Sequence, residues 1–186
     1  MGAEGPKTIT IHVTGFKKFQ GVSENPTETI VSNLKGFLKK RGLPPGVTLG
    51  SCTVLDTAGD GAFPMLNKVL EAGTATMDAP RNQPVVWLHL GVNSGAQKFA
   101  VERQAVNEAT FHCPDEFGWQ PQQVPIVPED GGISHTRETT CHVDAILKLV
   151  KKKGFDVMVS EDAGRFVCNY LWPEISVCSL PTVLQH

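Results

Sequence analysis

The sequence lacks the features that would place it in a membrane or a secretory pathway. No apolar run among its 186 residues approaches the roughly 18 needed to cross a bilayer. The first residues, MGAEGPKT, contain no apolar stretch typical of a signal peptide, and position 6 is proline where a myristoylation signal needs Ser or Thr. These absences predict a cytosolic protein without a membrane partner.

A large excess of positive or negative charge is also lacking, because 17 Lys and Arg residues nearly balance 19 Asp and Glu residues. No basic block stands out, so we expect no nucleic-acid partner. The longest charged run, Lys151–Lys153, suits the end of a helix, where cations complement the helix dipole. The sequence predicts no particular oligomer.

Motifs for metals, disulfides and phosphate groups are missing as well. The five cysteines form no C-x-x-C pair, which argues against a zinc site and a disulfide framework. No G-x-G-x-x-G follows the first predicted strand, so a flavodoxin-like or other nucleotide-cofactor protein is an unfavoured alternative. We therefore expect neither a metal nor a cofactor.

The composition, 40% apolar and 19% charged, predicts a folded domain in which strands and helices alternate. We predict strands at 8–16, 47–56, 84–92 and 155–162, helices at 26–41, 62–72 and 138–153, and a loop over 112–136. This order predicts an α/β fold with a mainly parallel sheet and helices on its faces. Ligands of such sheets gather at the carboxyl ends of the strands.

Three groups of residues follow predicted strands and could carry chemistry. Phe16 and Phe19 could form an apolar wall, or they could simply pack in the core. Glu102 could orient an imidazole, or it could be a surface residue paired with Arg103 or another cation.

Cys168 follows a turn at 162–164, and a short helix is expected to begin near it. A helix N-terminus would lower the pKa of the thiol, and its N–H groups could receive an oxyanion. The alternative is a buried cysteine with a structural role.

Taken together, three motifs resemble the pyroglutamyl peptidase I (pyrrolidone-carboxylate peptidase) family. They are TGFxxF with a later NPT (14–19 and 25–27), the glycine-rich run leading to ER…N (91–107), and SxDAGRxxCN (160–169). The resemblance covers most of the chain, from about residue 8 to Tyr170. It implies a three-layer α/β/α sandwich and a cysteine exopeptidase that removes N-terminal pyroglutamate from peptides.

The resemblance also assigns roles to individual residues. It makes Cys168 the nucleophile and Glu102 the acidic member of a Glu…Cys…His triad. Positions that line the pyroglutamyl pocket in the family correspond to Phe16, Phe19, Val92 and Val167. Such walls suit the substrate, because the lactam is flat, neutral and compact, whereas a charged amine would be poorly received there.

The family's histidine lies about two dozen residues after the cysteine, on a late strand that a helix follows, and the resemblance fails before that point. After Tyr170 the sequence reads LWPEISVCSLPTVLQH, with two prolines and no β-branched strand. We therefore predict a family-like domain over 1–170, without the last family strand and helix, and a divergent tail over 171–186. We expect this chain to be a weak or inactive exopeptidase; the alternative is a non-catalytic isoform that binds pyroglutamyl peptides or a full-length partner.

Overall fold

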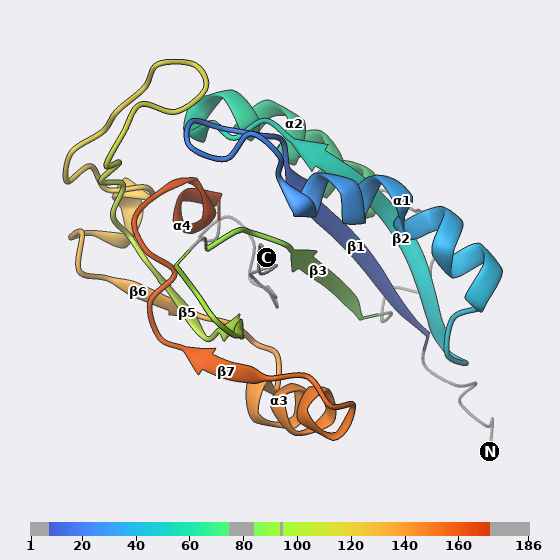
Figure 1. Ribbon diagram of the computed structural model, residues 1–186. Coiled ribbons are helices and arrows are strands. Elements are labelled where there is room, and N and C mark those ends of the chain that lie inside the picture. Colours follow the sequence, from blue (N-terminus) through green and yellow to red (C-terminus); the bar gives the residue numbers. More distant parts are fainter. Residues whose placement is uncertain (1–7, 75–83, 94, 172–186) are drawn as a thin grey trace.

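The computed structural model describes residues 8–74, 84–93 and 95–171, and these residues form alternating strands and helices (Figure 1). The elements are β1 (Ile9–Phe16), α1 (Pro26–Arg41), β2 (Val47–Leu55), α2 (Gly59–Thr74), β3 (Val85–His89), β4 (Phe99–Glu102), β5 (Gln104–Val106), β6 (Thr136–Glu138), α3 (Val143–Lys152), β7 (Val157–Ser160) and α4 (Val167–Leu171), with a short 3-10 turn at Pro128–Asp130. The α/β fold predicted from the sequence is confirmed.

Most of the strand pairs are parallel, as predicted. β1 lies between β2 and β3, and Thr14 of β1 is in register with His89 of β3. β4 pairs in parallel with β7, which places Glu102 opposite Ser160. The one antiparallel ladder joins β5 to β6 among the described strands.

The sequence prediction failed between β3 and α3. β4, β5 and β6 are only three or four residues long, so they give no alternating pattern to recognise. Glu138, the first residue of the predicted helix, is instead the last residue of β6, and the helix begins at Val143.

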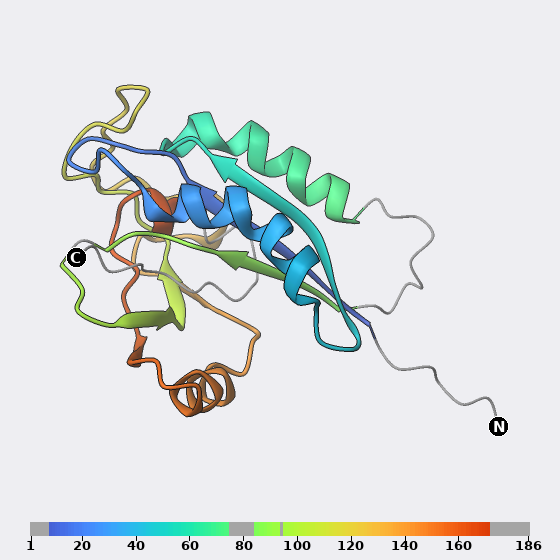
Figure 2. The same cartoon turned by 45° about the vertical axis from the view of Figure 1, so that its right-hand side comes forward.

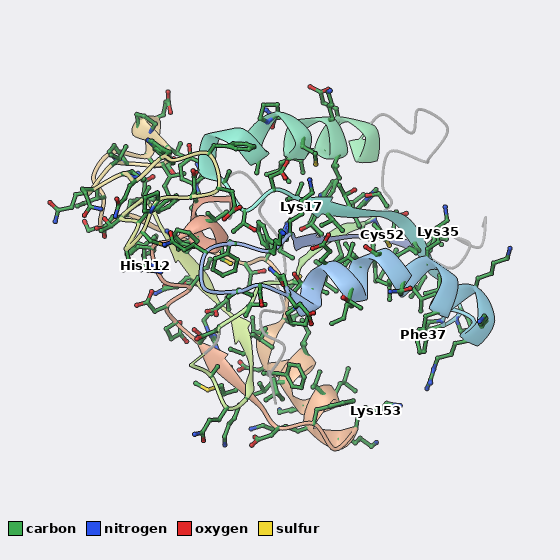
Figure 3. All side chains as sticks on the ribbon, turned by 45° about the horizontal axis from the view of Figure 1, so that its top comes forward. Lys17, Lys35, Phe37, Cys52, His112 and Lys153 are labelled. Atoms are coloured by element: carbon green, nitrogen blue, oxygen red, sulfur yellow. The ribbon has the colours of Figure 1, made fainter. Side chains whose placement is uncertain are left out.

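Helix α1 begins where its capping residues predict. The side chain of Asn25 accepts a hydrogen bond from the Thr27 N–H at 3.0 Å, and Pro26 occupies the first turn. The buried face carries Thr27 and Val31, whereas the predicted apolar residue Phe37 is 54% exposed and projects from the outer part of the helix (Figure 3). The helical spacing of the apolar residues at 30, 34, 37 and 38 predicts a buried stripe, and the exposure of Phe37 contradicts that prediction.

The two faces of β1 meet different helices. Gly15 faces α1 so closely that a β-carbon on it would lie 2.7 Å from the Thr27 carbonyl oxygen. The next residue, Phe16, points to the other face and belongs to the main core cluster with Leu66 of α2. Helices α1 and α2 thus flank the β1–β2 region on opposite sides (Figure 2).

Two apolar clusters hold the described residues together. The main one comprises Phe16, Leu55, Ala62, Leu66, Trp87, Ala109, Phe111, Val167 and Tyr170. The second packs the apolar face of α3 against Val101 of β4 and Val157 of β7, and α3 lies beside β7 in Figure 1. No described helix is both long enough and apolar enough to cross a membrane.

Candidate functional site

A cavity of about 590 Å³ opens where β1, β3, β4 and β7 end, at the edge expected for ligands in parallel sheets. All six residues singled out in the sequence line it: Phe16, Phe19, Val92, Glu102, Val167 and Cys168. These residues come from four separate segments of the chain, and the fold brings the segments together around one cavity.

Cys168 is the second residue of α4, and two contacts fix its position. Its Sγ lies against Gly91, because a β-carbon built on that glycine would be 2.8 Å from the sulfur. The next residue, Asn169, is fully buried and ties α4 to the segment after β4. Its amide donates to the carbonyls of Val106 and Glu108 and accepts from the Val106 N–H, at 2.8, 2.9 and 2.9 Å.

The predicted lowering of the Cys168 pKa is wrong for the arrangement observed. Burial raises the pKa of the thiol to about 11, and the negative charge of Glu102 adds to the increase. A short helix end offers only a partial positive charge, which does not offset the loss of hydration. The thiol is therefore protonated at neutral pH.

Glu102 ends β4 and is only 8% exposed, so its interpretation as a surface residue is wrong. The residue expected to pair with it, Arg103, instead forms ion pairs with Asp144 and Glu161. Burial raises the pKa of Glu102 to about 7, partly opposed by a hydrogen bond from Ser160. Its Oε2 is buried and has no hydrogen-bond partner among the described residues.

Aromatic rings form one wall of the cavity. Phe166, which the sequence analysis did not single out, has its ring centroid 5.9 Å from that of Phe19 and 4.7 Å from that of Phe111. The exposed ring of His112, labelled in Figure 3, lies 5.0 Å from Phe166. Because Phe16 both lines the cavity and belongs to the core, the two interpretations of this residue are compatible.

The turn before α4 is held by a charged cluster. Arg165 donates to Asp162 at 2.6 Å and to Glu108 at 3.1 Å, and Gly164 adopts a positive φ of 77°. Glu108 in turn accepts a hydrogen bond from Thr110 at 2.7 Å. This cluster fixes the DAGR segment at the cavity edge.

The histidines of the described residues do not hydrogen-bond the Cys168 thiol. His12 contacts Ser51 at 2.9 Å and stacks on Trp87 with ring centroids 4.3 Å apart, so it has a structural role in the sheet. His89 hydrogen-bonds Thr14 through Nδ1, but it also lines the cavity. The sequence placed His89 in a strand and gave no indication of which side of the sheet it faces.

The chain is similar in sequence to a set of peptidases. Residues 9–179 match the profile of the pyroglutamyl peptidase family. The pyrrolidone-carboxylate peptidase of Pyrococcus furiosus is 29% identical over 163 residues, covering 88% of this chain and 70% of that protein. The protein of the same name from Klebsiella pneumoniae is 31% identical over 159 residues, covering 86% and 66%.

Solved structures give the same result. Pyrrolidone carboxyl peptidase from Fervidobacterium islandicum AW-1 matches with a TM-score of 0.75 and 23% identity, over 94% of this chain and 80% of that one. Pyroglutamyl peptidase I from Bacillus amyloliquefaciens matches with a TM-score of 0.73 and 26% identity, over 92% and 81%. The parallel sheet with flanking helices is thus shared with these proteins.

Proposed function

The chain belongs to the pyroglutamyl peptidase family of cysteine peptidases, and from this we propose that Cys168 is its nucleophile and Glu102 the acidic member of its catalytic set. The Cys168 sulfur attacks the carbonyl carbon of an N-terminal pyroglutamyl residue, and the C–N bond to the next residue breaks. The thiol proton leaves with the new amino terminus of the shortened peptide. Water then hydrolyses the thioester, releasing pyroglutamate and restoring the thiol.

The observation that carries this proposal is the position of Cys168 in a cavity that has apolar residues on part of its wall. Phe16, Phe19, Val92 and Val167 line the cavity together with the thiol. A flat, neutral lactam loses little hydration on entering such a space, whereas a protonated amine would lose a great deal. The proposed substrates are therefore peptides that begin with pyroglutamate.

The protonated state of the Cys168 thiol favours slow turnover by this chain. With a pKa of about 11, only about one Cys168 thiol in ten thousand is ionised at pH 7. No described imidazole hydrogen-bonds the thiol, and losing a base that acts together with a nucleophile costs several orders of magnitude in rate. The same observation favours a second candidate function, the binding of pyroglutamyl peptides or a full-length partner without turnover.

Hydrolysis of a pyroglutamyl-amide reporter by the thiol-reduced chain tests the proposal. We expect slow hydrolysis that is abolished in Cys168→Ala and kept in Cys52→Ala, because Cys52 lies in β2 and does not line the cavity. A rate equal to that of Cys168→Ala would contradict turnover. A chain whose tail after Tyr170 is replaced by a family-like strand, histidine and helix should hydrolyse the reporter much faster.

Two expectations from the sequence stay predictions. The first is the boundary at Tyr170; residues 172–186 lie outside the described part, and the family match runs on to residue 179. The second is location in the cytosol.

A further inference from the structure

One residue that lines the cavity, His89, carries a buried polar atom that the proposed chemistry does not use. The Nε2 atom of His89 is buried and has no hydrogen-bond partner among the described residues. Its other ring nitrogen, Nδ1, is paired with the Thr14 hydroxyl across the β1–β3 ladder. Buried polar atoms without protein partners are rare in folded proteins, so such an atom on a residue that lines a cavity is a candidate to pair with a ligand.

The pairing with Thr14 favours one tautomer of the His89 ring. Thr14 is fully buried, and its hydroxyl hydrogen needs an acceptor. Nδ1 of His89 is the only side-chain partner of that hydroxyl among the described residues. If the hydroxyl donates to Nδ1, the ring hydrogen sits on Nε2, and this lining residue offers a donor rather than an acceptor.

The ring is also neutral under ordinary conditions. Burial lowers the pKa of His89 to about 4. A neutral donor can pair with a carbonyl oxygen of an uncharged ligand without the cost of burying a charge.

The position of His89 along β3 selects which carbonyl it meets. The Leu90 N–H donates to the Thr14 carbonyl at 2.9 Å, so the chain stays extended past β3, and residues 89 and 91 share one side of it. Gly91 touches the Cys168 sulfur, and His89 lies about 6–7 Å deeper along the strand. The His89 ring therefore lies near the far edge of a pyroglutamyl ring whose attached acyl carbon lies beside the Cys168 sulfur.

Building on the proposed function, we propose that His89 is a specificity-determining residue whose Nε2–H donates a hydrogen bond to the ring carbonyl of the pyroglutamyl group. Thr14 acts as its positioning residue, because its hydroxyl fixes the tautomer and the direction of the ring. The apolar walls then select the shape of the lactam, and His89 selects its carbonyl.

Small cyclic ligands test this without any need for turnover. The full chain, labelled with ¹⁵N-histidine, is titrated with 2-pyrrolidone and with cyclopentanone, which keeps the ring size and the carbonyl but lacks the N–H. We expect both ligands to shift the Nε2 resonance of His89 more than its Nδ1 resonance, and the free ring to show the Nε2–H tautomer. This measurement needs no variant and therefore does not depend on a variant's folding.

Two matched substitutions separate the two ring nitrogens. His89→Gln places an amide N–H near the former Nε2, whereas His89→Asn keeps a polar group toward Thr14 but withdraws the donor from the cavity. Loss of one hydrogen bond in His89→Asn should weaken the binding of 2-pyrrolidone by about threefold to tenfold. The loss of affinity in His89→Gln should be much smaller. Phe19→Ala serves as a control that weakens binding through the apolar wall.

The outcomes distinguish this inference from the proposed function. If neither ligand binds the wild-type chain, both are overturned. If Phe19→Ala weakens the binding of 2-pyrrolidone, but His89→Asn does not and the ligand leaves the Nε2 resonance unshifted, only the role of His89 is overturned. If 2-pyrrolidone moves the Nε2 resonance and cyclopentanone does not, His89 reads the ring N–H, and the proposed pairing with the carbonyl is wrong.

Discussion

The contact between Gly91 and the Cys168 sulfur makes a sharp prediction about Gly91→Ala. The added β-carbon would lie 2.8 Å from Sγ, well inside normal contact distance. Overpacking of this kind costs about 1–3 kcal/mol of unfolding free energy. For a domain of this size that corresponds to a fall in Tm of about 2–12 °C.

The same substitution should behave differently once the sulfur is gone. In a Cys168→Ala background the nearest remaining atom of residue 168 is its Cβ, 3.9 Å away, which is ordinary contact. Gly91 is not among the glycines with positive φ, so alanine is tolerated there and restricts the unfolded chain, a gain of about 0.4–1 kcal/mol. The cycle of the two substitutions should therefore show a coupling of about 2 kcal/mol.

Urea or thermal unfolding of the four proteins, followed by circular dichroism, measures this coupling. Gly36→Ala is the matched control, because no atom lies within 4 Å of a β-carbon on this helical glycine and the substitution should stabilise the chain. Equal effects of Gly91→Ala in both backgrounds would show that the sulfur does not face Gly91. The geometry assigned to Cys168, the proposed nucleophile, would then be wrong.

Three further predictions concern the same site. Asn169→Ala removes the side-chain partners of the part-buried Val106 N–H and Glu108 carbonyl and should lower the free energy of unfolding by about 2–4 kcal/mol in urea. A loss below about 1 kcal/mol would argue against the anchor. Alkylation of Cys168 by iodoacetamide should accelerate about tenfold per pH unit from pH 7 to 10, because the pKa of the thiol is about 11. A plateau in the alkylation rate near pH 8 would contradict this, and Cys168→Ser gives the background rate. Folding raises the pKa of Glu102 from 4.5 to about 7, so its contribution to stability is full below pH 4.5 and is lost as pH rises through 7. Glu102→Gln should remove this loss and be about 1–3 kcal/mol more stable than the wild-type chain at pH 8. Equal dependence of stability on pH in the two proteins would refute the shift.

Regular elements of the fold were predictable because their patterns repeat over enough residues. The strand at 8–16 alternates, and Asn25, Pro26 and Gly42 mark the ends of α1. The strands β4, β5 and β6 were missed because three or four residues carry no period, and they exist only through pairing with distant partners. Local pattern also misplaced the start of α3, since residues 139–142 form a connection and not a helical turn.

The candidate site was predictable from the family resemblance and not from spacing. Locally, Glu102 was as compatible with a surface pair as with a site, and only the pairing of β4 with β7 buries it. The pKa of Cys168 was predicted in the wrong direction, because a helix end is visible in sequence whereas burial and the distance to Glu102 are not. The role proposed for His89 was hidden for the same reason, since it depends on which side of β3 faces Cys168.

The anchor made by Asn169 links the site to the order in which the chain folds. Its partners Val106 and Glu108 lie 63 and 61 residues earlier in the chain, and His89 meets Thr14 across 75 residues. Contacts of such long range require extensive loop closure, so we expect the sulfur to reach its place against Gly91 late in folding. Until then the thiol is solvated and ionises at its ordinary pKa. During refolding, a thiol reagent should therefore modify Cys168 with its ordinary pKa before the sulfur reaches Gly91 and with a pKa of about 11 afterwards, so the pH dependence of modification reports when the site assembles.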